Sequence, residues 1–276
     1  MSISATDVNK LRTMTGAGMM DCKKALTEAN GDFEAAIDIL RKKGQKISAS
    51  RADKEAKEGA VFVGTNLQNN EGIIIALNCE TDFVAKNEEF ISLGNMILKA
   101  ALDSKPVTIE DLKALPANGR NIIDFITDLM GKIGEKIDIS SYEIVQGEQV
   151  VPYIHSNAKI GVLVGLKNTG GKDVIEAGKD VAMQIAAMRP VAIDKDDVDP
   201  RTIEREIEIG KEQARAEGKP EAMLEKIAVG KLNKFYKDST LLNQDFVKDP
   251  SVTVAQLLDK INKGLTVNAF KRVNIG

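Results

Sequence analysis

The chain has 276 residues with a formal net charge of -3, and 29% of its residues are charged. Such a nearly balanced charge argues against a protein whose main task is to grip nucleic acid through its phosphates. No apolar run approaches the ~20 residues of a membrane span, and two isolated cysteines, Cys22 and Cys79, suit a reducing compartment, so we expect a cytoplasmic protein without membrane contact.

Residues 1–44 are predicted to form a bundle of three short helices. Apolar residues recur there at helical spacing, as in the run from Phe33 to Leu40. Gly16-Ala17-Gly18 and Asn30-Gly31-Asp32 interrupt that spacing and mark the breaks between the helices. About 40 residues is near the lower size limit of an independent fold, so we expect a small module.

Residues 41–57 carry seven Lys and Arg side chains against two acidic ones and are nearly free of large apolar side chains, and residues 45–58 are predicted to form a basic linker. A patch that binds nucleic acid or the ribosome is the alternative for the wider basic run at residues 41–57. Charged runs are more often solvated than bound, so the linker is the preferred interpretation.

The core is predicted to consist of two similar halves. In each half an apolar strand leads through a turn to a helical pattern, first from Ile73–Leu77 and then from Ile160–Leu166. The following helix contains a glycine at the matching position, Gly94 or Gly178. This repeat predicts an α+β fold with two subdomains, each an antiparallel sheet with a packed helix. The predicted halves are residues 59–146 and residues 147–199 with 241–276.

Residues 200–240 are strongly charged and carry only a narrow apolar stripe at coiled-coil spacing. The stripe occurs twice, and Gly218-Lys219-Pro220 turns the chain between its two copies. A thin seam with two charged faces is typical of helices that protrude rather than join a core. We therefore expect an inserted helical hairpin with coiled-coil packing in this segment.

Residues typical of enzyme active sites are scarce. His155 is the only histidine, so no Ser-His-Asp or Cys-His arrangement can form without it. The segment Gly16 to Asp21 only faintly resembles a dinucleotide-binding motif, because a helix precedes it. With no phosphate-binding loop and no metal-ligand spacing, we expect a non-enzymatic interaction protein that uses no cofactor or metal and binds no nucleotide directly.

Residues 78–87 stand out as a candidate contact with a partner. An apolar strand ends immediately before them and a helical pattern follows, so Phe83 and Asp82 lie near the start of a helix. In one interpretation Thr81 or Asp82 only caps the helix, and Phe83 packs inward alongside Phe90. In the other, Phe83 projects from the fold into a partner.

Several long motifs resemble the elongation factor Ts family, in order along nearly the whole chain. The matching motifs are Leu11 to Leu26, Asn78 to Asn87, Gly131 to Glu135, Tyr153 to His155 with Ile160 to Val164, and Glu204 to Glu221. The family's N-terminal domain is similar to ubiquitin-associated domains, which agrees with three helices in residues 1–44. The resemblance implies a protein that binds elongation factor Tu and speeds GDP release, so that GTP can rebind during translation elongation.

The resemblance also implies roles for particular residues. Phe83 would be a wedge that enters between helices of the partner's GTP-binding domain, with Thr81 and Val84 in the same contact. Asp82 would help to disturb the water network around the partner's Mg²⁺. The remaining contacts would be Met19, Met20 and Lys23 near the partner's nucleotide site, together with Ile133, Gly134 and His155.

Other hypotheses stay open at this point. Self-association through residues 200–240, as a homodimer or a 2:2 complex with elongation factor Tu, is one of them. A rival function is a ubiquitin-associated-type adaptor or an RNA-associated protein that uses residues 41–57, and it predicts salt-sensitive RNA binding by residues 1–58. A small-molecule enzyme would instead require His155 for turnover.

Overall fold

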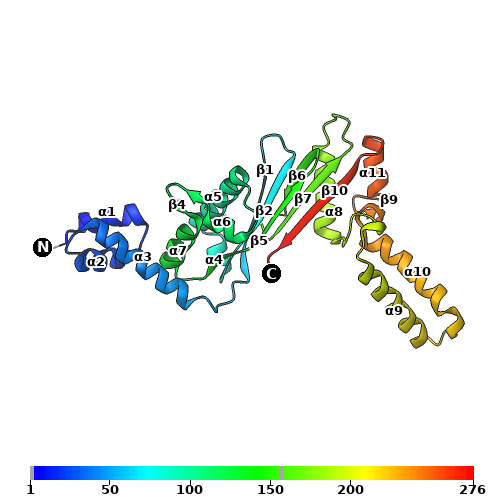
Figure 1. Cartoon of the computed structure of the whole chain (residues 1–276), viewed down its shortest axis with the longest axis horizontal. Helices are drawn as coiled ribbons and strands as arrows, with labels where there is room; N and C mark the ends of the chain where they lie inside the picture. The colour runs from blue at the N-terminus through cyan, green and yellow to red at the C-terminus, as the bar shows by residue number, and fades with distance from the viewer. Residues whose placement is uncertain (1–2, 156–157) are drawn as a thin grey trace. The chain divides into compact units, whose positions relative to one another are not determined.

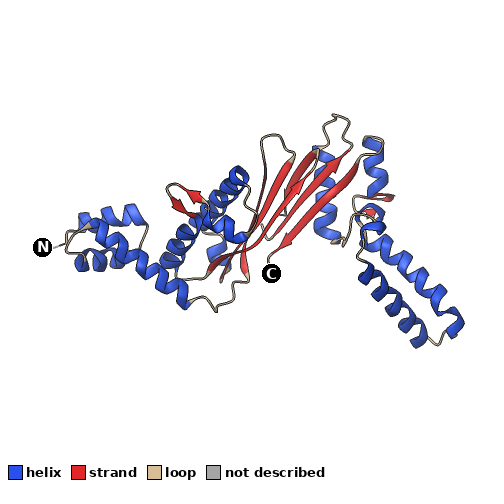
Figure 2. Cartoon of the chain, viewed as in Figure 1, coloured by secondary structure: helices blue, strands red, loops and turns tan. Residues whose placement is uncertain are grey.

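The computed structural model of the protein describes residues 3–155 and 158–276 (Figure 1). Helices and small sheets are mixed along the chain (Figure 2), which confirms the predicted α+β class. The chain forms two compact units. The first unit contains Met1–Phe62, Ile74–Tyr142 and Val273–Gly276, and the second contains Val63–Ile73 and Glu143–Arg272.

The three N-terminal helices are α1 (Ala5–Thr15), α2 (Met19–Glu28) and α3 (Phe33–Ser50). Ser4 and Asp32 cap α1 and α3 by accepting bonds from backbone N–H groups. Gly16 ends α1 in the left-handed region, with a φ of 67°. Leu11 and Leu26 are completely buried, so this bundle has an apolar core of its own.

The third helix extends beyond the predicted bundle, because residues 45–50 are helical rather than linker. Gly44 of α3 lies against Gly131 of α7 (Ile122–Ile133), and a Cβ built on Gly131 would come within 2.7 Å of the Gly44 Cα. Two glycines allow the backbones of crossing helices to approach this closely. The contact therefore helps to hold the second half of α3 through backbone approach, which leaves no hydrophobic signal in the sequence.

Gly131→Ala is expected to destabilise the first unit by about 1–3 kcal/mol, because the new methyl group must push α3 and α7 apart. Urea unfolding followed by circular dichroism would measure the loss. Gly230→Ala is the matched control, since nothing lies within 4 Å of a Cβ at Gly230 in α10 (Glu221–Ser239) and alanine favours the helix. Equal stability of the two variants would contradict the tight crossing.

The first sheet has the strand order β1-β2-β5, with β1 (Glu58–Thr65), β2 (Glu71–Cys79) and β5 (Ile137–Gln146). Every residue of β2 is buried, as expected for a central strand that is covered on both faces. Between β2 and β5, in addition to α7, the chain forms α4 (Asp82–Ala85), α5 (Glu88–Ser104), α6 (Ile109–Ala114), β3 (Pro116–Ala117) and β4 (Arg120–Asn121).

Residues 63–73 group with the second unit, although the sequence places them within the first predicted half of the core. The reason is a backbone contact at the tip of the β1–β2 hairpin. Gly147 and Val150 donate their N–H groups to the carbonyls of Asn70 and Asn69, at 3.0 and 2.6 Å. The tip of this hairpin is thus held by residues of the second unit.

The second sheet has the order β10-β7-β6, with β6 (Gln149–Ile154), β7 (Ile160–Lys167) and β10 (Thr266–Asn274). Strands β6 and β7 pair antiparallel with Val151 opposite Val164, and both valines join an apolar cluster with Val181 and Ile185 of α8 (Ile175–Met188). The unit is completed by η1 (Lys195–Asp197), η2 (Leu241–Asn243), β8 (Asp245–Phe246), β9 (Asp249–Thr253) and α11 (Val254–Ile261).

Each sheet receives a helix whose glycine lies directly against a strand side chain. A Cβ on Gly94 in α5 would come within 2.0 Å of the Phe62 ring, and one on Gly178 in α8 within 2.4 Å of Val151. Only a glycine permits this approach of helix to sheet. The predicted repeat therefore corresponds to the same packing of a helix on a sheet in both subdomains.

Residues 200–240 form the predicted helical hairpin, with α9 (Pro200–Ala216) preceding α10. Its seam is thin, and a Cβ on Gly210 would lie only 3.1 Å from the Ala228 Cα. Outside the seam, the Lys211–Glu225 ion pair links the two helices at 2.8 Å. Self-association through this hairpin stays a prediction. In the described part of the chain, every helix falls short of the length or the apolar character that crossing a bilayer requires.

Candidate partner-binding surface

Strand β2 leads the chain into a single helical turn, α4, that carries Phe83 outward. Thr81 is the N-cap of this turn, and its side-chain oxygen accepts a bond from the Val84 N–H at 3.4 Å. Phe83 is 82% exposed, whereas Phe90 in α5 is completely buried. Thr81 thus caps the helix as expected, but the interpretation in which Phe83 packs inward alongside Phe90 is wrong.

Val84 requires a correction, because its side chain faces inward. It is only 7% exposed, and the neighbouring Ala85 is buried as well. Burying apolar area fixes the turn to the body of the protein. Val84 therefore supports Phe83 from below, and it is not itself available for the partner contact that the sequence predicted.

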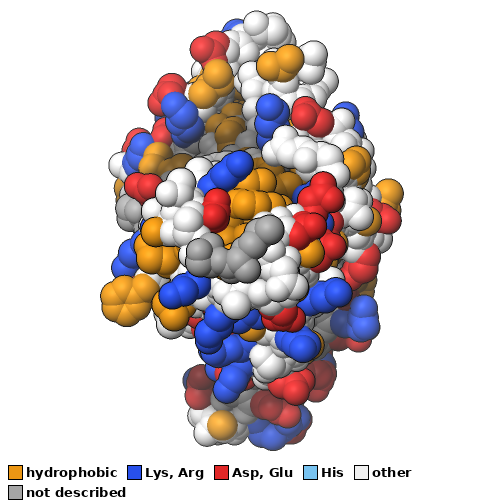
Figure 3. All heavy atoms as spheres, turned by 90° about the vertical axis from the view of Figure 1, so that its left-hand side faces the viewer, with side chains coloured by type: hydrophobic (Ala, Val, Ile, Leu, Met, Phe, Trp, Pro, Cys, Tyr) orange, Lys and Arg blue, Asp and Glu red, His pale blue; other side chains and the backbone are white. Residues whose placement is uncertain are grey.

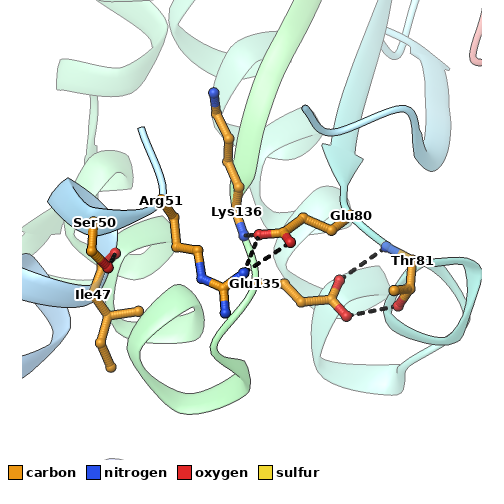
Figure 4. A network of polar contacts seen from close by, with 7 residues as sticks. All are labelled: Ile47, Ser50, Arg51, Glu80, Thr81, Glu135 and Lys136. Atoms are coloured by element: carbon orange, nitrogen blue, oxygen red, sulfur yellow. Dashed lines mark hydrogen bonds and ion pairs between the residues drawn. The ribbon is translucent and has the colours of Figure 1, made fainter. Parts of the chain in front are cut away.

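Two glutamates connect the turn that carries Phe83 to the end of α7 (Figure 4). Glu135 accepts bonds from the Thr81 N–H at 3.0 Å and from the Thr81 hydroxyl at 2.7 Å. Glu80 in turn accepts a bond from the Lys136 N–H at 2.7 Å. Each segment thus holds a backbone amide of the other, and we call these paired contacts the carboxylate clasp.

Arg51 connects the carboxylate clasp to the end of α3. Its Nη1 donates to both oxygens of Glu80, at 3.2 and 3.0 Å, and both side chains are partly buried (Figure 4). A partly buried, charge-assisted pair is stronger than an ordinary surface ion pair. The last helix of the N-terminal bundle is therefore fixed to the same junction as the turn that carries Phe83.

Asp82 occupies the first position of α4, where a negative charge is favourable. Lys86 donates to one of its carboxylate oxygens at 2.7 Å, and this hydrogen bond raises the pKa of Lys86. The pair lies at the surface, where ion pairs contribute little to stability. The Asp82–Lys86 pair therefore adds little to the stability of the turn.

Ile133 and Gly134 end α7, and Gly134 adopts the left-handed conformation that glycine favours, with a φ of 83°. Both residues are half-buried. Glu135 follows them directly and binds Thr81. The structure thus brings the predicted contacts at Ile133 and Gly134 together with those at the start of α4.

Met19, Met20 and Lys23 lie in the N-terminal half of α2. The two methionines are 52% and 63% exposed, and Lys23 is exposed as well. Figure 3 views the N-terminal end of the molecule and shows hydrophobic side chains at the surface among charged ones. Flexible, exposed methionines are suited to an adaptable apolar contact.

His155 is exposed and follows β6 in the second unit, whereas the other predicted site residues belong to the first. Its Nδ1 lies 3.0 Å from the Tyr153 hydroxyl, and its backbone N–H donates to the Ile160 carbonyl at 2.9 Å. Within residues 3–155 and 158–276, no group of three His, Cys, Asp or Glu side chains could hold a metal ion.

Cys79 lies at the end of β2, beneath the turn that carries Phe83. Burial, followed by the negative charges of Glu135 and Glu58, raises the pKa of this thiol to about 12. The protonated thiol donates to the Thr81 carbonyl at 3.1 Å. A neutral, buried thiol is a poor nucleophile, so Cys79 acts in packing.

Folded protein is expected to leave Cys79 unmodified by Ellman's reagent near neutral pH and to expose it on unfolding.

The stability of the protein should also depend on pH through Cys79. Because the unfolded thiol ionises near pH 8.5, the folded state binds one more proton than the unfolded state from there up to about pH 12. The free energy of unfolding should therefore fall as the pH rises through this range. Cys79→Ala, compared in a Cys22→Ala background, should flatten that fall. An unchanged slope would contradict the raised pKa.

Comparison with known proteins places this chain in a family. A family model described as elongation factor Ts matches residues 80–276. The chain belongs to the elongation factor Ts family. An elongation factor Ts from Cytophaga hutchinsonii is 66% identical over 99% of both chains, and one from Amoebophilus asiaticus is 58% identical over 100% of both. One from Paracoccus denitrificans is 45% identical over 100% of this chain and 93% of its own.

Membership of the elongation factor Ts family makes the protein a translation elongation factor that acts in protein biosynthesis. The sequence alone does not indicate a role for Glu80, Glu135 or Arg51. Glu80 and Glu135 both lie shortly after the end of a strand or helix, where a carboxylate can reach a backbone amide of a neighbouring junction. That position was the available signal, but it does not identify which amide is bound.

The basic run at residues 41–57 is already partly neutralised within the fold. Paired cations offer less free charge to nucleic-acid phosphates, which weakens the RNA-binding alternative. The ion pairs are Arg41–Asp38, Lys43–Asp21, Arg51–Glu80 and Lys57–Glu55.

Proposed function

We propose that the protein is a guanine-nucleotide exchange factor that binds elongation factor Tu with GDP and promotes release of the GDP. The observation that carries this proposal is Phe83, an aromatic side chain exposed on an ordered turn. A rigid aromatic buries a large apolar area with little loss of conformational freedom. Such a residue is suited to insertion into a partner, and family membership supports the identity of that partner.

Exchange requires no covalent step in this proposal. Phe83 enters between helices of the partner's GTP-binding domain and stabilises the nucleotide-free state. Asp82 disturbs the water shell of the partner's Mg²⁺, which otherwise bridges the phosphates and neutralises their charge. The protein itself binds no nucleotide and uses no cofactor, so it is not an enzyme in the usual sense.

Linkage sets the size of the effect that binding can have. If the protein weakens GDP binding by some factor, GDP weakens binding of the protein by the same factor. Each tenfold corresponds to about 1.4 kcal/mol, and burial of one Phe side chain supplies about 1.5–3 kcal/mol. Phe83 alone can therefore account for roughly a ten- to hundredfold change.

The other predicted site residues extend the proposed contact. Met19, Met20 and Lys23 present the N-terminal bundle near the partner's nucleotide site, and Ile133 with Gly134 adds to the contact around Phe83. His155, in the second unit, is proposed as a separate contact with the same partner. Because elongation factor Tu works in translation, the complex forms in the cytoplasm.

Release of a fluorescent GDP analogue from purified elongation factor Tu tests the proposal. Addition of the protein, with unlabelled GDP in excess, should accelerate release, and the rate should saturate as the protein concentration rises. Excess Mg²⁺ should oppose the acceleration, because it restores the Mg²⁺ bridge between the phosphates of the bound nucleotide. Release at the intrinsic rate at every concentration would exclude exchange activity, and RNA binding by residues 1–58 would then be the function to test.

A further inference from the structure

The turn that carries Phe83 is too short to be stable by itself. It has four residues, and a single helical turn gains too few backbone bonds to offset the ordering of its chain. Its side-chain cap, from the Val84 N–H to the Thr81 hydroxyl, measures 3.4 Å, which is long for a hydrogen bond. Something outside the turn must therefore contribute to its order.

Glu135 is in the right place to do so. Its two carboxylate oxygens bind two different donors of Thr81, the backbone N–H and the hydroxyl, at 3.0 and 2.7 Å (Figure 4). These are charge-assisted bonds, which are stronger than neutral ones. They fix both the backbone and the side-chain rotamer of the N-cap, two residues before Phe83.

The position of Glu135 is itself well determined. On one side of Glu135, Gly134 turns the chain at the end of α7. On the other side, Lys136 donates its backbone N–H to Glu80. Glu80 is held in turn by Arg51. The carboxylate that orders Thr81 thus comes from a segment that is fixed on both sides.

We infer that Glu135 is a positioning residue for nucleotide exchange, through its bonds to Thr81. It holds the α4 turn in the orientation in which Phe83 enters the partner, so that the turn itself does not have to be ordered on binding. This inference rests on the exchange function proposed above. If Glu135 only stabilised the fold, its loss would lower stability and would act independently of Phe83.

Glu135→Gln retains one acceptor oxygen but loses the charge and the second bond to Thr81. The maximal exchange rate, measured with the protein in saturating excess over elongation factor Tu, should fall about tenfold, the effect of losing one charge-assisted bond. Asp138→Asn is the matched control. It makes the same chemical change on the neighbouring strand, where Asp138 pairs with Lys113 at 2.6 Å and does not touch Thr81.

A double variant separates positioning from mere stabilisation. In a Phe83→Ala background, Glu135→Gln should have no further effect on exchange, because there is no longer a side chain to position. Full additivity of the two effects, or wild-type exchange by Glu135→Gln alone, would overturn the inference. Wild-type protein that fails to accelerate exchange at all would instead overturn the proposed function.

Amide hydrogen exchange of the free protein tests the same inference without the partner. Glu135→Gln should speed exchange at the amides of Val84, Ala85 and Lys86, while Asp138→Asn should leave them protected. Both variants should keep the wild-type melting temperature within a few degrees. Unchanged protection of the turn in Glu135→Gln would show that the turn does not depend on this carboxylate. Thr81→Val removes the hydroxyl on the other side of the contact, and it should cause the same loss of amide protection in the turn as Glu135→Gln.

Discussion

Phe83→Ala is expected to slow GDP release from elongation factor Tu by roughly ten- to hundredfold relative to the wild-type protein. The substitution removes most of the apolar area that would be buried in the nucleotide-free complex. It removes almost nothing from the free protein, because the ring is exposed. The maximal exchange rate should therefore fall while the melting temperature stays the same, as measured by fluorescent GDP release and by circular dichroism.

Leu67→Ala is a suitable control for that experiment. Leu67 is even more exposed than Phe83, at 97%, and lies between β1 and β2. If exposed apolar area in general promoted exchange, this variant would lose activity as well. Wild-type exchange by Phe83→Ala would leave the exchange function standing but would return Phe83 to a minor role.

Phe90→Ala is expected to give the opposite pattern. Phe90 is completely buried in α5, and removing a buried Phe side chain leaves a cavity that costs about 3–5 kcal/mol. A typical domain is stable by only about 5–15 kcal/mol, so a large part of the stability of the first unit should disappear. Urea unfolding followed by circular dichroism would measure the loss.

Phe90→Leu tests whether volume is the cause of that loss, since it retains much of the buried side chain and should cost less. At temperatures where Phe90→Ala remains folded, its saturating exchange rate should approach that of the wild-type protein. A stability unchanged by Phe90→Ala would contradict the burial of this ring.

The arrangement of strands and helices was predictable where burial follows a regular period. The strand predicted at Ile160–Leu166 is β7, which has one more residue, Lys167. It was predictable because consecutive buried residues identify such a strand locally. The short helix α6 was missed, because only Leu112 among its residues is buried. Its capping box of Thr108 and Asp111 was a usable signal.

The second half of α3 and the orientation of Phe83 were harder for physical reasons. Gly44 and Gly131 hold α3 by backbone contact, and a glycine gives no hydrophobic signal. Phe83 and Phe90 are seven residues apart, which would place them on the same face of one continuous helix. The helix is not continuous: α4 ends at Ala85, and Asn87 caps the start of α5. That interruption frees Phe83 to point outward.

The carboxylate clasp could not be predicted from the sequence, because its partners are distant along the chain. Glu135 binds a residue 54 positions away, and Glu80 binds one 56 positions away. Such contacts depend on where β2 and α7 end in space. The resemblance to the elongation factor Ts family pointed to Phe83, but it did not explain how Phe83 is held.

The carboxylate clasp also limits how this region can change during evolution. Besides the Thr81 hydroxyl and the Arg51 guanidinium, Glu80 and Glu135 bind backbone amides, which every residue except proline supplies. The bond from position 136 to Glu80 therefore tolerates any residue except proline, although the Lys136 side chain also donates to the Ala52 carbonyl at 2.6 Å. Substitution is restricted much more at Glu80 and Glu135 than at the positions whose backbone amides they bind. The order of the turn that carries Phe83 thus depends on a glutamate outside the turn as well as on its own buried Val84.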